Sequence, residues 1–306
     1  MQTPGSISTR LVAPPWGHST VSWYLVRSRL PTGPDAGSTQ PYTRTVPIFF
    51  VDRTQVGAGG EVRIRGRDAW HISKVLRSRR GDLATIVVDH GVEHDIRLDQ
   101  LGSDEVVGTI VASRSGGREP RAQIHVVQGL PKGQGMSEIC ERLAELGAAS
   151  IWPAFTARSV PRLDGHAAST RKQRWQTIAK EAAQLAGRHQ VPPVHTPAPL
   201  LEVVAELQAH IPGLQLLACH GSELAPALTA IPWAVGSPTG LLIGPEGGFS
   251  PEEVEQLAGV GASLVSLGPR NLRTVLAGVV ATTVLLARSR DLEPQPGVNS
   301  SEGALR

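Results

Sequence analysis

Hydrophobic residues follow two different spacings along this chain, and the first spacing is that of β-strands. Between residues 46 and 113, short β-rich runs are separated by glycine and aspartate; they read VPIFFVD, EVRIRG, DLATIVVD, HDIRLDQL and EVVGTIVAS. In EVRIRG, Val62 and Ile64 alternate with Arg63 and Arg65, as expected of a strand with one buried face. These runs predict a small β-barrel over residues 46–115.

One helical spacing interrupts the strands. Over residues 68–77 the apolar side chains recur on one face, and they are Ala69, Ile72, Val75 and Leu76. Asp68 stands where the N-cap of this helix is expected. After the last strand, the stretch SRSGGREPRA at residues 113–122 has the composition of a linker.

From Gln123 onward, strands alternate with helices. Continuous apolar runs predict strands at residues 124–129, 150–155, 214–219, 240–244 and 264–268. Helices are predicted at 136–147 and 169–187, a third begins at the Ser250-Pro251-Glu252-Glu253 capping box, and the last begins with Thr274 as N-cap. The alternation predicts an α/β domain with a largely parallel sheet over residues 120–290, in which ligands bind beyond the carboxyl ends of the strands.

The two ends of the chain differ from these regions. Residues 1–45 are rich in Pro, Ser, Thr and Gly and contain three Arg and no acid before Asp35. We expect a disordered N-terminal extension, either an over-extended gene start or a segment resembling an organellar transit peptide. Residues 291–306 are expected to form a disordered tail.

Composition excludes several classes of protein. With 40% hydrophobic and 19% charged residues, the 306-residue chain is globular, and a net charge of +3 means that nucleic-acid binding requires local basic patches. Two cysteines, Cys140 and Cys219, cannot form a disulfide framework, which favours a reduced, cytoplasmic location. The 14-residue uncharged stretch 274–287 is shorter than the ~20 residues of a membrane-spanning helix, so it predicts a buried helix and no membrane role.

Two short motifs suggest chemistry that their contexts oppose. His90-Gly91-Val92-Glu93-His94 matches the H-x-x-E-H pattern of zinc peptidases, but that chemistry needs a helix, and here the segment follows a strand and contains an Asp-His-Gly turn signal. We therefore expect a hairpin turn and no metal. GLPKGQG lacks the P-loop pattern, so Lys132 is expected to be a surface residue.

Three loops are the strongest signal for a ligand site. Residues 218–221, 244–248 and 267–274 end or follow a predicted buried strand; the second contains three glycines and each of the others contains one. Glycine permits close approach of the backbone, so such loops can surround a planar ligand with main-chain groups. The alternative is that they are ordinary tight turns.

Basic residues gather in two places. Residues 63–80 hold seven Lys or Arg against one acid, and residues 158–190 hold seven against two. Either patch alone is equally consistent with a solvated surface. Two patches dominated by arginine, one on each predicted domain, favour an RNA-binding surface.

Several stretches between Val46 and Ser289 resemble one known family. VPIFFVD with HISKVLRSRRGD, PKGQGMSEICERLAELGAASIWPAFTARSV, RWQTIAKEAAQLAGRHQVPPV, GPEGGFSPEEVE and LGPRNLRT are similar, in order and spacing, to the RsmE-type 16S rRNA (uracil-N3) methyltransferases of the SPOUT superfamily. Arg142 stands where that family commonly has Lys. The last two stretches are the most specific.

The resemblance implies a SPOUT-type trefoil-knotted α/β domain preceded by a small PUA-like β-barrel domain. It further implies a homodimer, S-adenosyl-L-methionine as cofactor, and methylation of N3 of a uridine in 16S rRNA of the 30S subunit. The cofactor-binding residues that it implies are Leu217, Ala218, Cys219, His220, Ile243, Gly244, Pro245, Glu246, Gly247, Gly248, Leu267, Gly268, Asn271 and Leu272.

Residues that would face RNA by the same resemblance are Arg53, His71 and Arg77 in the barrel and Arg158, Arg188 and His189 in the α/β domain. Arg270 or Arg273 is the expected catalytic residue, because an arginine can stabilise the negative charge that develops on a uracil oxygen. The alternative is that either arginine ties its loop to a carboxylate such as Glu246.

One position departs from the family pattern. After Arg273-Thr274 the family usually has Glu or Ser followed by Thr, whereas this chain has Val275 and Leu276. If this apolar pair faces the core, the pocket survives; if it faces the pocket, a hydrogen bond is lost. The departure leaves open a second function, that of an RNA-binding homodimer with weakened or lost catalysis.

Overall fold

The computed structural model describes residues 47–293 apart from residues 90, 116–117, 161–164 and 222–223. The chain divides into Met1–Thr43 and Arg44–Arg306, and everything described below belongs to the second unit. The expected disordered extension and tail therefore lie outside the described residues, except Asp291, Leu292 and Glu293.

The first sheet confirms the strands predicted between residues 46 and 113. Its order is β1-β3-β4-β5-β2, with β1 parallel to β3 and the other pairs antiparallel. Val62 and Ile64 are buried and Arg63 and Arg65 exposed, as the alternation predicts. The strands are β1 (Ile48–Val51), β2 (Glu61–Arg65), β3 (Leu83–Val88), β4 (Val92–Leu101) and β5 (Glu105–Ser115), with two 3-10 turns at Arg53–Gln55 and Ala58–Gly60.

The helix predicted at residues 68–77 is built differently. A short α-helix, α1 (Arg67–Trp70), runs into a π-helical turn, His71–Val75, in which the Leu76 N–H donates to the His71 carbonyl. Gly66 takes the N-cap position, so the assignment of Asp68 as N-cap is wrong. Val75, expected to face inward, is exposed, because the wider π-turn shifts the inward face.

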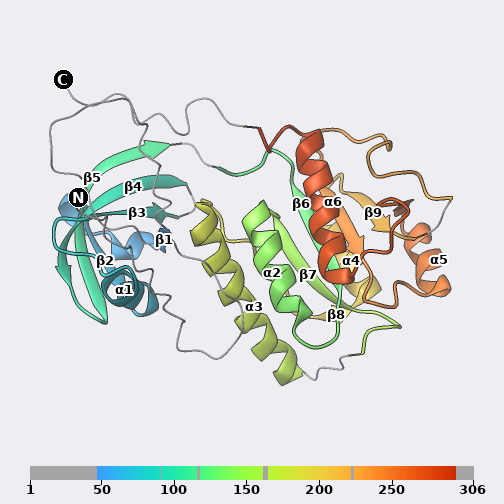
Figure 1. The fold of residues 1–306 in the computed structure, drawn as a ribbon, viewed down its shortest axis with the longest axis horizontal. Helices are drawn as coiled ribbons and strands as arrows, with labels where there is room; N and C mark the ends of the chain where they lie inside the picture. The colour runs from blue at the N-terminus through green and yellow to red at the C-terminus, as the bar shows by residue number, and fades with distance from the viewer. Residues whose placement is uncertain (1–46, 90, 116–117, 161–164, 222–223, 294–306) are drawn as a thin grey trace, which may run out of the picture. The chain divides into compact units, whose positions relative to one another are not determined.

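The second sheet confirms the parallel α/β prediction. Its order is β11-β9-β10-β6-β7-β8, and every pair is parallel (Figure 1). Its strands are β6 (Ile124–Gly129), β7 (Ser150–Phe155), β8 (Ala198–Pro199), β9 (Gln215–Cys219), β10 (Thr239–Ile243) and β11 (Ser263–Val265). β11 is shorter than predicted, and β5 extends into the expected linker.

Helices cover both faces of this sheet. α2 (Gly135–Leu146) lies between α3 (Gly165–Ala186) and α6 (Thr274–Arg288), and their apolar side chains share a core with the Val126 face of the sheet (Figure 1). α4 (Leu200–His210), which the sequence analysis missed, and α5 (Pro251–Gly259) belong to the core on the Val127 face. The capping box of α5 is confirmed, because Ser250 accepts the Glu253 N–H and the Glu253 side chain accepts the Ser250 N–H. None of the helices in the described ranges is both long and apolar enough to cross a membrane.

The end of β6 approaches the loop after β10 so closely that only glycine fits. A Cβ atom on Gly129 would lie 2.8 Å from the backbone nitrogen of Pro245 and 2.7 Å from its Cδ. These atoms belong to a proline ring and its backbone, which cannot rotate away as a flexible side chain can. This contact holds the carboxyl ends of β6 and β10 together at one edge of the sheet.

Gly129→Ala should therefore lower the free energy of unfolding by about 1–3 kcal/mol, the usual cost of an overpacked site. Urea denaturation of the purified protein measures it. Gly259→Ala is the matched control, because a Cβ there meets nothing within 4 Å and lies in α5; its stability should be unchanged or raised by about 0.5–1 kcal/mol. Equal urea midpoints for Gly129→Ala and wild type would contradict the close approach.

A buried histidine lies near the amino end of the second sheet. His125 Nδ1 is 2.7 Å from Ser150 Oγ, which also accepts the indole N–H of Trp152, and the His195 ring stacks on Trp152. His125 Nε2 is buried and has no partner among the described residues. Burial lowers the pKa of His125 from 6.5 to about 4, and the charge of His195 adds to the effect.

The protein should lose stability as the pH falls from 6.5 to about 4. In this window the unfolded chain binds a proton on His125 that the folded chain does not, and above 6.5 the difference vanishes. His125→Gln should flatten the pH dependence of the urea midpoint without abolishing it, because burial also lowers the pKa of His195. His166→Gln, at an exposed position of α3, is the control; an unaltered profile in His125→Gln would refute the assignment.

Candidate cofactor and RNA-binding site

The three loops predicted to bind a ligand lie at one edge of the second sheet. Cys219, at the end of β9, pairs in register with Ile243, at the end of β10, and with Val265, at the end of β11. Because these strands are parallel, the segments that follow them leave from the same side. The backbone thus brings together loops whose preceding strands end 24 and 22 residues apart in the sequence, at Cys219, Ile243 and Val265.

A buried amide ties this edge together. Gln128, fully buried at the end of β6, donates from Nε2 to Thr274 Oγ1 at 2.9 Å and to the Gly129 carbonyl at 2.9 Å. The Thr274 hydroxyl donates to the Gly244 carbonyl at 2.6 Å. Thr274 was predicted to be an N-cap; Arg273 occupies that position, and the Thr274 side chain instead joins α6 to the loop after β10.

The loop after β10 depends on its glycines. Gly248 adopts a φ of +69°, and its N–H donates to the Pro245 carbonyl. A Cβ on Gly244 would lie 2.9 Å from the Gly248 backbone. Glu246 accepts the Lys132 N–H at 3.0 Å, and the Lys132 side chain is exposed as predicted.

Arg158 lies beside this loop. Its Nη1 donates to the Gly247 carbonyl at 2.7 Å, and the adjacent Ala157 N–H donates to the Glu253 carboxylate at 2.7 Å. The segment after β7 is therefore bonded to the middle of the loop after β10 and to the first turn of α5. Arg158 was expected to face RNA; it is exposed, and it is positioned by the candidate cofactor loop.

The loop after β11 carries the two candidate catalytic arginines. Gly268 has a φ of +101° and donates its N–H to Ser266 Oγ. Arg270 and Arg273 are exposed, and in the described ranges of the chain neither pairs with a carboxylate. The alternative in which one of them ties the loop to Glu246 is thus not what the structure shows, because the partner of Glu246 is the Lys132 backbone.

Hydrogen-bonding groups dominate the described part of this edge. Burial raises the pKa of the Cys219 thiol to about 12, so the thiol stays protonated near neutral pH. Within the part of the chain that the structure describes, no group of three or more His, Cys, Asp or Glu side chains could hold a metal ion. Main-chain groups of glycine-rich loops, with arginines beside them, suit a polar, planar ligand.

The H-x-x-E-H segment forms the predicted hairpin. β3 and β4 pair antiparallel, with Val88 opposite Val92, and Glu93 and His94 lie on β4. His90 lies outside the described residues. Glu93 and His94 are consecutive on a strand and therefore point to opposite faces. The described part of this motif thus lacks the helical geometry of a zinc peptidase.

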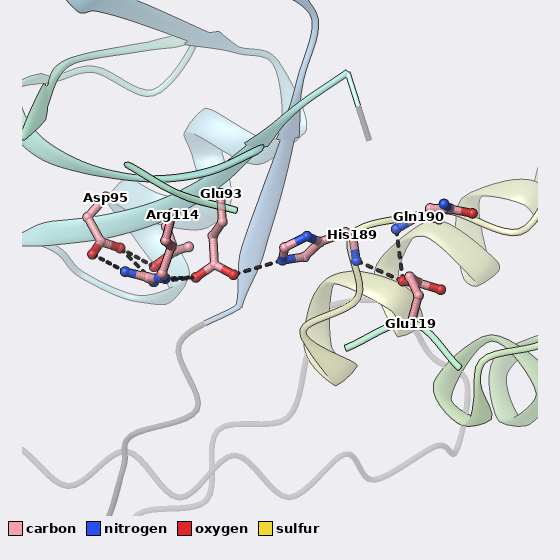
Figure 2. A network of polar contacts seen from close by, with 7 residues as sticks. Glu93, Asp95, Arg114, Glu119, His189 and Gln190 are labelled. Carbon is pink, nitrogen blue, oxygen red and sulfur yellow. Dashed lines mark hydrogen bonds and ion pairs between the residues drawn. The ribbon is translucent and has the colours of Figure 1, made fainter. Parts of the chain in front are cut away.

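Arg188 and His189 are buried, which contradicts the prediction that they face RNA; Figure 2 shows His189 bonded to Glu93 and Glu119. Arg188 is only 3% exposed, and its guanidinium donates to the Glu119 carboxylate and to the carbonyls of Ala144 and Ala148. His189 is equally buried, with Nε2 2.8 Å from a carboxylate oxygen of Glu93. A buried charge must be satisfied inside the protein, and these acceptors satisfy the guanidinium of Arg188 within the fold.

The barrel residues expected to face RNA differ among themselves. Arg53 and Arg77 are exposed, and Arg77 has a φ of +51°. His71 points inward: its Nε2 is buried, its ring meets Phe49 edge-on, and burial lowers its pKa. The expectation that His71 faces RNA is therefore wrong.

In each basic patch, one acid is paired with a cation of the other patch. Lys180 on α3 is 2.9 Å from Asp68, and Arg67 on α1 is 2.7 Å from Glu181. Other cations of these patches stay exposed, including Lys74, Arg77, Arg171 and Arg174. These ion pairs use some of the cations, so fewer unpaired charges are available to contact RNA than the residue counts of the two patches suggest.

Comparisons with known proteins identify the family. Residues 118–286 match the family model for the RNA methyltransferase domain. The ribosomal RNA small subunit methyltransferase E of Bacillus subtilis is 30% identical over 78% of this chain and 94% of its own length, and that of Mycobacterium bovis is 31% identical over 76% and 88%. A crystal structure of the Neisseria gonorrhoeae enzyme of the same name, bound to S-adenosyl methionine, is 26% identical, covers 79% of this chain and 98% of its own, and has a TM-score of 0.71.

The family model covers more than half of this chain, and the Bacillus relative aligns along nearly its whole length. The predicted resemblance is confirmed. The chain belongs to the RNA methyltransferase family that includes ribosomal RNA small subunit methyltransferase E.

Proposed function

We propose that this protein transfers a methyl group from S-adenosyl-L-methionine to N3 of a uridine in 16S rRNA of the small ribosomal subunit. The observation that carries the proposal is the meeting of three loops at one edge of the parallel sheet, in a chain whose Neisseria relative binds S-adenosyl methionine. Membership of the family supports rRNA as the substrate. The choice of N3 of uridine comes from the RsmE-type resemblance.

The cofactor-binding residues are the backbone-rich positions of these loops. They are the segments 217–220 and 243–248, together with Leu267, Gly268, Asn271 and Leu272. The structure fits this assignment, since Gly244 and Gly248 give the backbone a shape that side chains would fill, and Gly268 is also in the left-handed region. Bound S-adenosyl-L-methionine supplies an electrophilic methyl group on a sulfonium.

Arg270 or Arg273 would act on the uracil. N3 is a weakly acidic imide, so methylation there requires that its proton leaves to a base or to water, and the negative charge spreads onto the ring oxygens. An exposed guanidinium without a carboxylate partner is suited to stabilise that charge. Orientation of the base against the methyl group accounts for most of the remaining acceleration.

The finer features of the fold belong to the same proposal. A trefoil knot is supported by Arg288 at the end of α6, which donates to the carbonyls of Leu228 and Ile231 and lies over the Trp233 ring, so the segment between β9 and β10 closes against α6. The five-stranded mixed sheet supports a PUA-like barrel. A homodimer follows from the RsmE-type resemblance, and the rRNA substrate supports a cytoplasmic location.

The second candidate, an RNA-binding homodimer without efficient catalysis, rests on Val275 and Leu276. Val275 packs against the core shared by α2 and α6, and a Cβ on Gly135 would lie 3.1 Å from its Cγ1. Leu276 is 45% exposed. Because Val275 contacts the core and Gln128 and Thr274 still hold the loop, the structure favours an active enzyme.

Methyl transfer to isolated 30S subunits and to 16S rRNA tests the proposal, with 3-methyluridine measured by nucleoside mass spectrometry and cofactor binding by calorimetry. Gly247→Val should abolish cofactor binding and methylation, because a branched side chain enters the candidate pocket. The new Cβ would lie 3.1 Å from Cδ and 3.2 Å from Cβ of Arg158, so the fold should tolerate it once the Arg158 side chain shifts by a few tenths of an ångström.

Gly91→Val is the control, because its Cβ meets only the Asp89 carbonyl, at 3.9 Å. Wild-type affinity in folded Gly247→Val would defeat the assignment of this loop. Cofactor binding by the wild type without any methylation of 30S subunits or 16S rRNA would favour the binding-protein alternative.

Restoring the family pair should not accelerate the enzyme. Val275→Glu places a carboxylate against the core and should lower the free energy of unfolding by about 1–3 kcal/mol. Leu276→Thr, at an exposed position, should stay within about 0.5 kcal/mol of wild type. Urea denaturation and methylation rates measure both; a faster Val275→Glu/Leu276→Thr enzyme would show that the pair faces the pocket.

A further inference from the structure

One tryptophan of the first sheet's region is unusually accessible. Trp70, at the end of α1, is 39% exposed, whereas its neighbours Ala69 and Ile72 are fully buried. Of the four tryptophans in the described ranges, Trp152 and Trp175 are buried and Trp233 is half-buried. The indole of Trp70 therefore presents a large apolar surface to solvent on a helix whose opposite side forms the core.

The segment that carries Trp70 is fixed in place. Asp68 accepts from Lys180 at 2.9 Å and from Gln184 at 3.2 Å, both on α3, and Arg67 pairs with Glu181. The π-turn begins immediately after Trp70. Such turns are rare and frequent at functional sites. A ligand that contacts Trp70 would meet a platform whose backbone is already ordered, which lowers the entropic cost of binding.

The surroundings of Trp70 are positively charged. Residues 67–80 contain five Lys or Arg and one acid, Asp68, which is already paired with Lys180. From the neighbouring α3, Lys180 and Glu181 meet this segment, and both are paired, with Asp68 and Arg67. Lys74 is exposed one turn after Trp70. An aromatic face among cations is the chemistry that binds single-stranded nucleic acid, because bases stack while phosphates pair with the cations.

We propose that Trp70 stacks against an unpaired base of the ribosomal RNA, with Lys74 and the exposed arginines Arg77, Arg79 and Arg80 contacting the adjoining phosphates. The inference rests on the proposed function, since that function makes the partner an RNA. An uncharged protein surface would bury the indole equally well, but it would form no ion pairs with the cations around Trp70.

Trp70 acts in binding and not in chemistry. It belongs to the first sheet's region, whereas the candidate cofactor loops follow strands of the second sheet. A contact made equally in the ground state and the transition state raises KM when it is lost and leaves kcat unchanged. Loss of one base stack should weaken RNA binding by about 5- to 150-fold.

The first experiment compares Trp70→Ala, Trp70→Phe and Val260→Ala in the full chain. Val260 is the matched control, because it is also 39% exposed and follows α5 in the second sheet's region. Trp70→Ala should raise the Kd for a 16S rRNA transcript and the KM for 30S subunits at unchanged kcat and unchanged cofactor affinity. Trp70→Phe should retain most of the affinity, and Val260→Ala all of it.

The second experiment separates stacking from charge. The wild type should bind an octamer of adenylates more tightly than an octamer of abasic ribose phosphates, and Trp70→Ala should bind both equally. Lys74→Ala should keep the preference for bases and reduce the salt dependence of binding by about one unit of slope. Trp70→Ala should leave that slope unchanged.

Three results would overturn the inference: wild-type RNA affinity in folded Trp70→Ala, no preference of the wild type for adenylates over abasic phosphates, or a changed oligomeric mass of Trp70→Ala with unchanged RNA affinity. The last result would assign the indole to a protein interface. Failure of the proposed function is seen separately, as absent methyl transfer by a wild type whose RNA binding still depends on Trp70.

Discussion

The hydrogen bonds of Gln128 are the constraint on which the candidate site depends. One buried amide joins the end of β6 to Thr274 at the start of α6, and Thr274 joins both to the Gly244 carbonyl. Each of these groups is withdrawn from water, so loss of one partner leaves the others unsatisfied at a cost of about 1–3 kcal/mol. The loop after β10 and the loop before α6 are therefore held as one unit, which a backbone-lined pocket requires.

A second polar network contains Arg188 and His189, two residues that were predicted to contact RNA. Arg188 binds Glu119 and two carbonyls, and His189 binds Glu93, which also accepts from Arg114 on β5 (Figure 2). These contacts join β4 to the segment after α3. The positive charge of the sequence is thus divided between internal pairs and the exposed cations around Trp70, and our proposal assigns RNA recognition to the second group.

Patterns among neighbouring residues predicted helices and strands, whereas contacts between residues far apart in the sequence determine what individual side chains do. The alternation of β2 and the capping box of α5 involve neighbours in sequence, so both were correct. The partners of Lys180, His189 and Gln128 lie 112, 96 and 146 residues away in the sequence, so no local pattern predicts these contacts. The π-turn at residues 71–75 was missed because its apolar residues have the same spacing as an α-helix.

The way in which the site is built also explains how this chain can differ from its family at Val275 and Leu276. Glycine backbone and the buried Gln128–Thr274 pair shape the edge of the sheet, and neither depends on the side chain at position 276, which points to solvent. Relatives that share only 26–31% of their residues with this chain can keep the same pocket for this reason. The side chains that are free to vary are those on the exposed surface, and under our proposal Trp70 is such a position, one that contacts RNA without any change in the candidate cofactor loops.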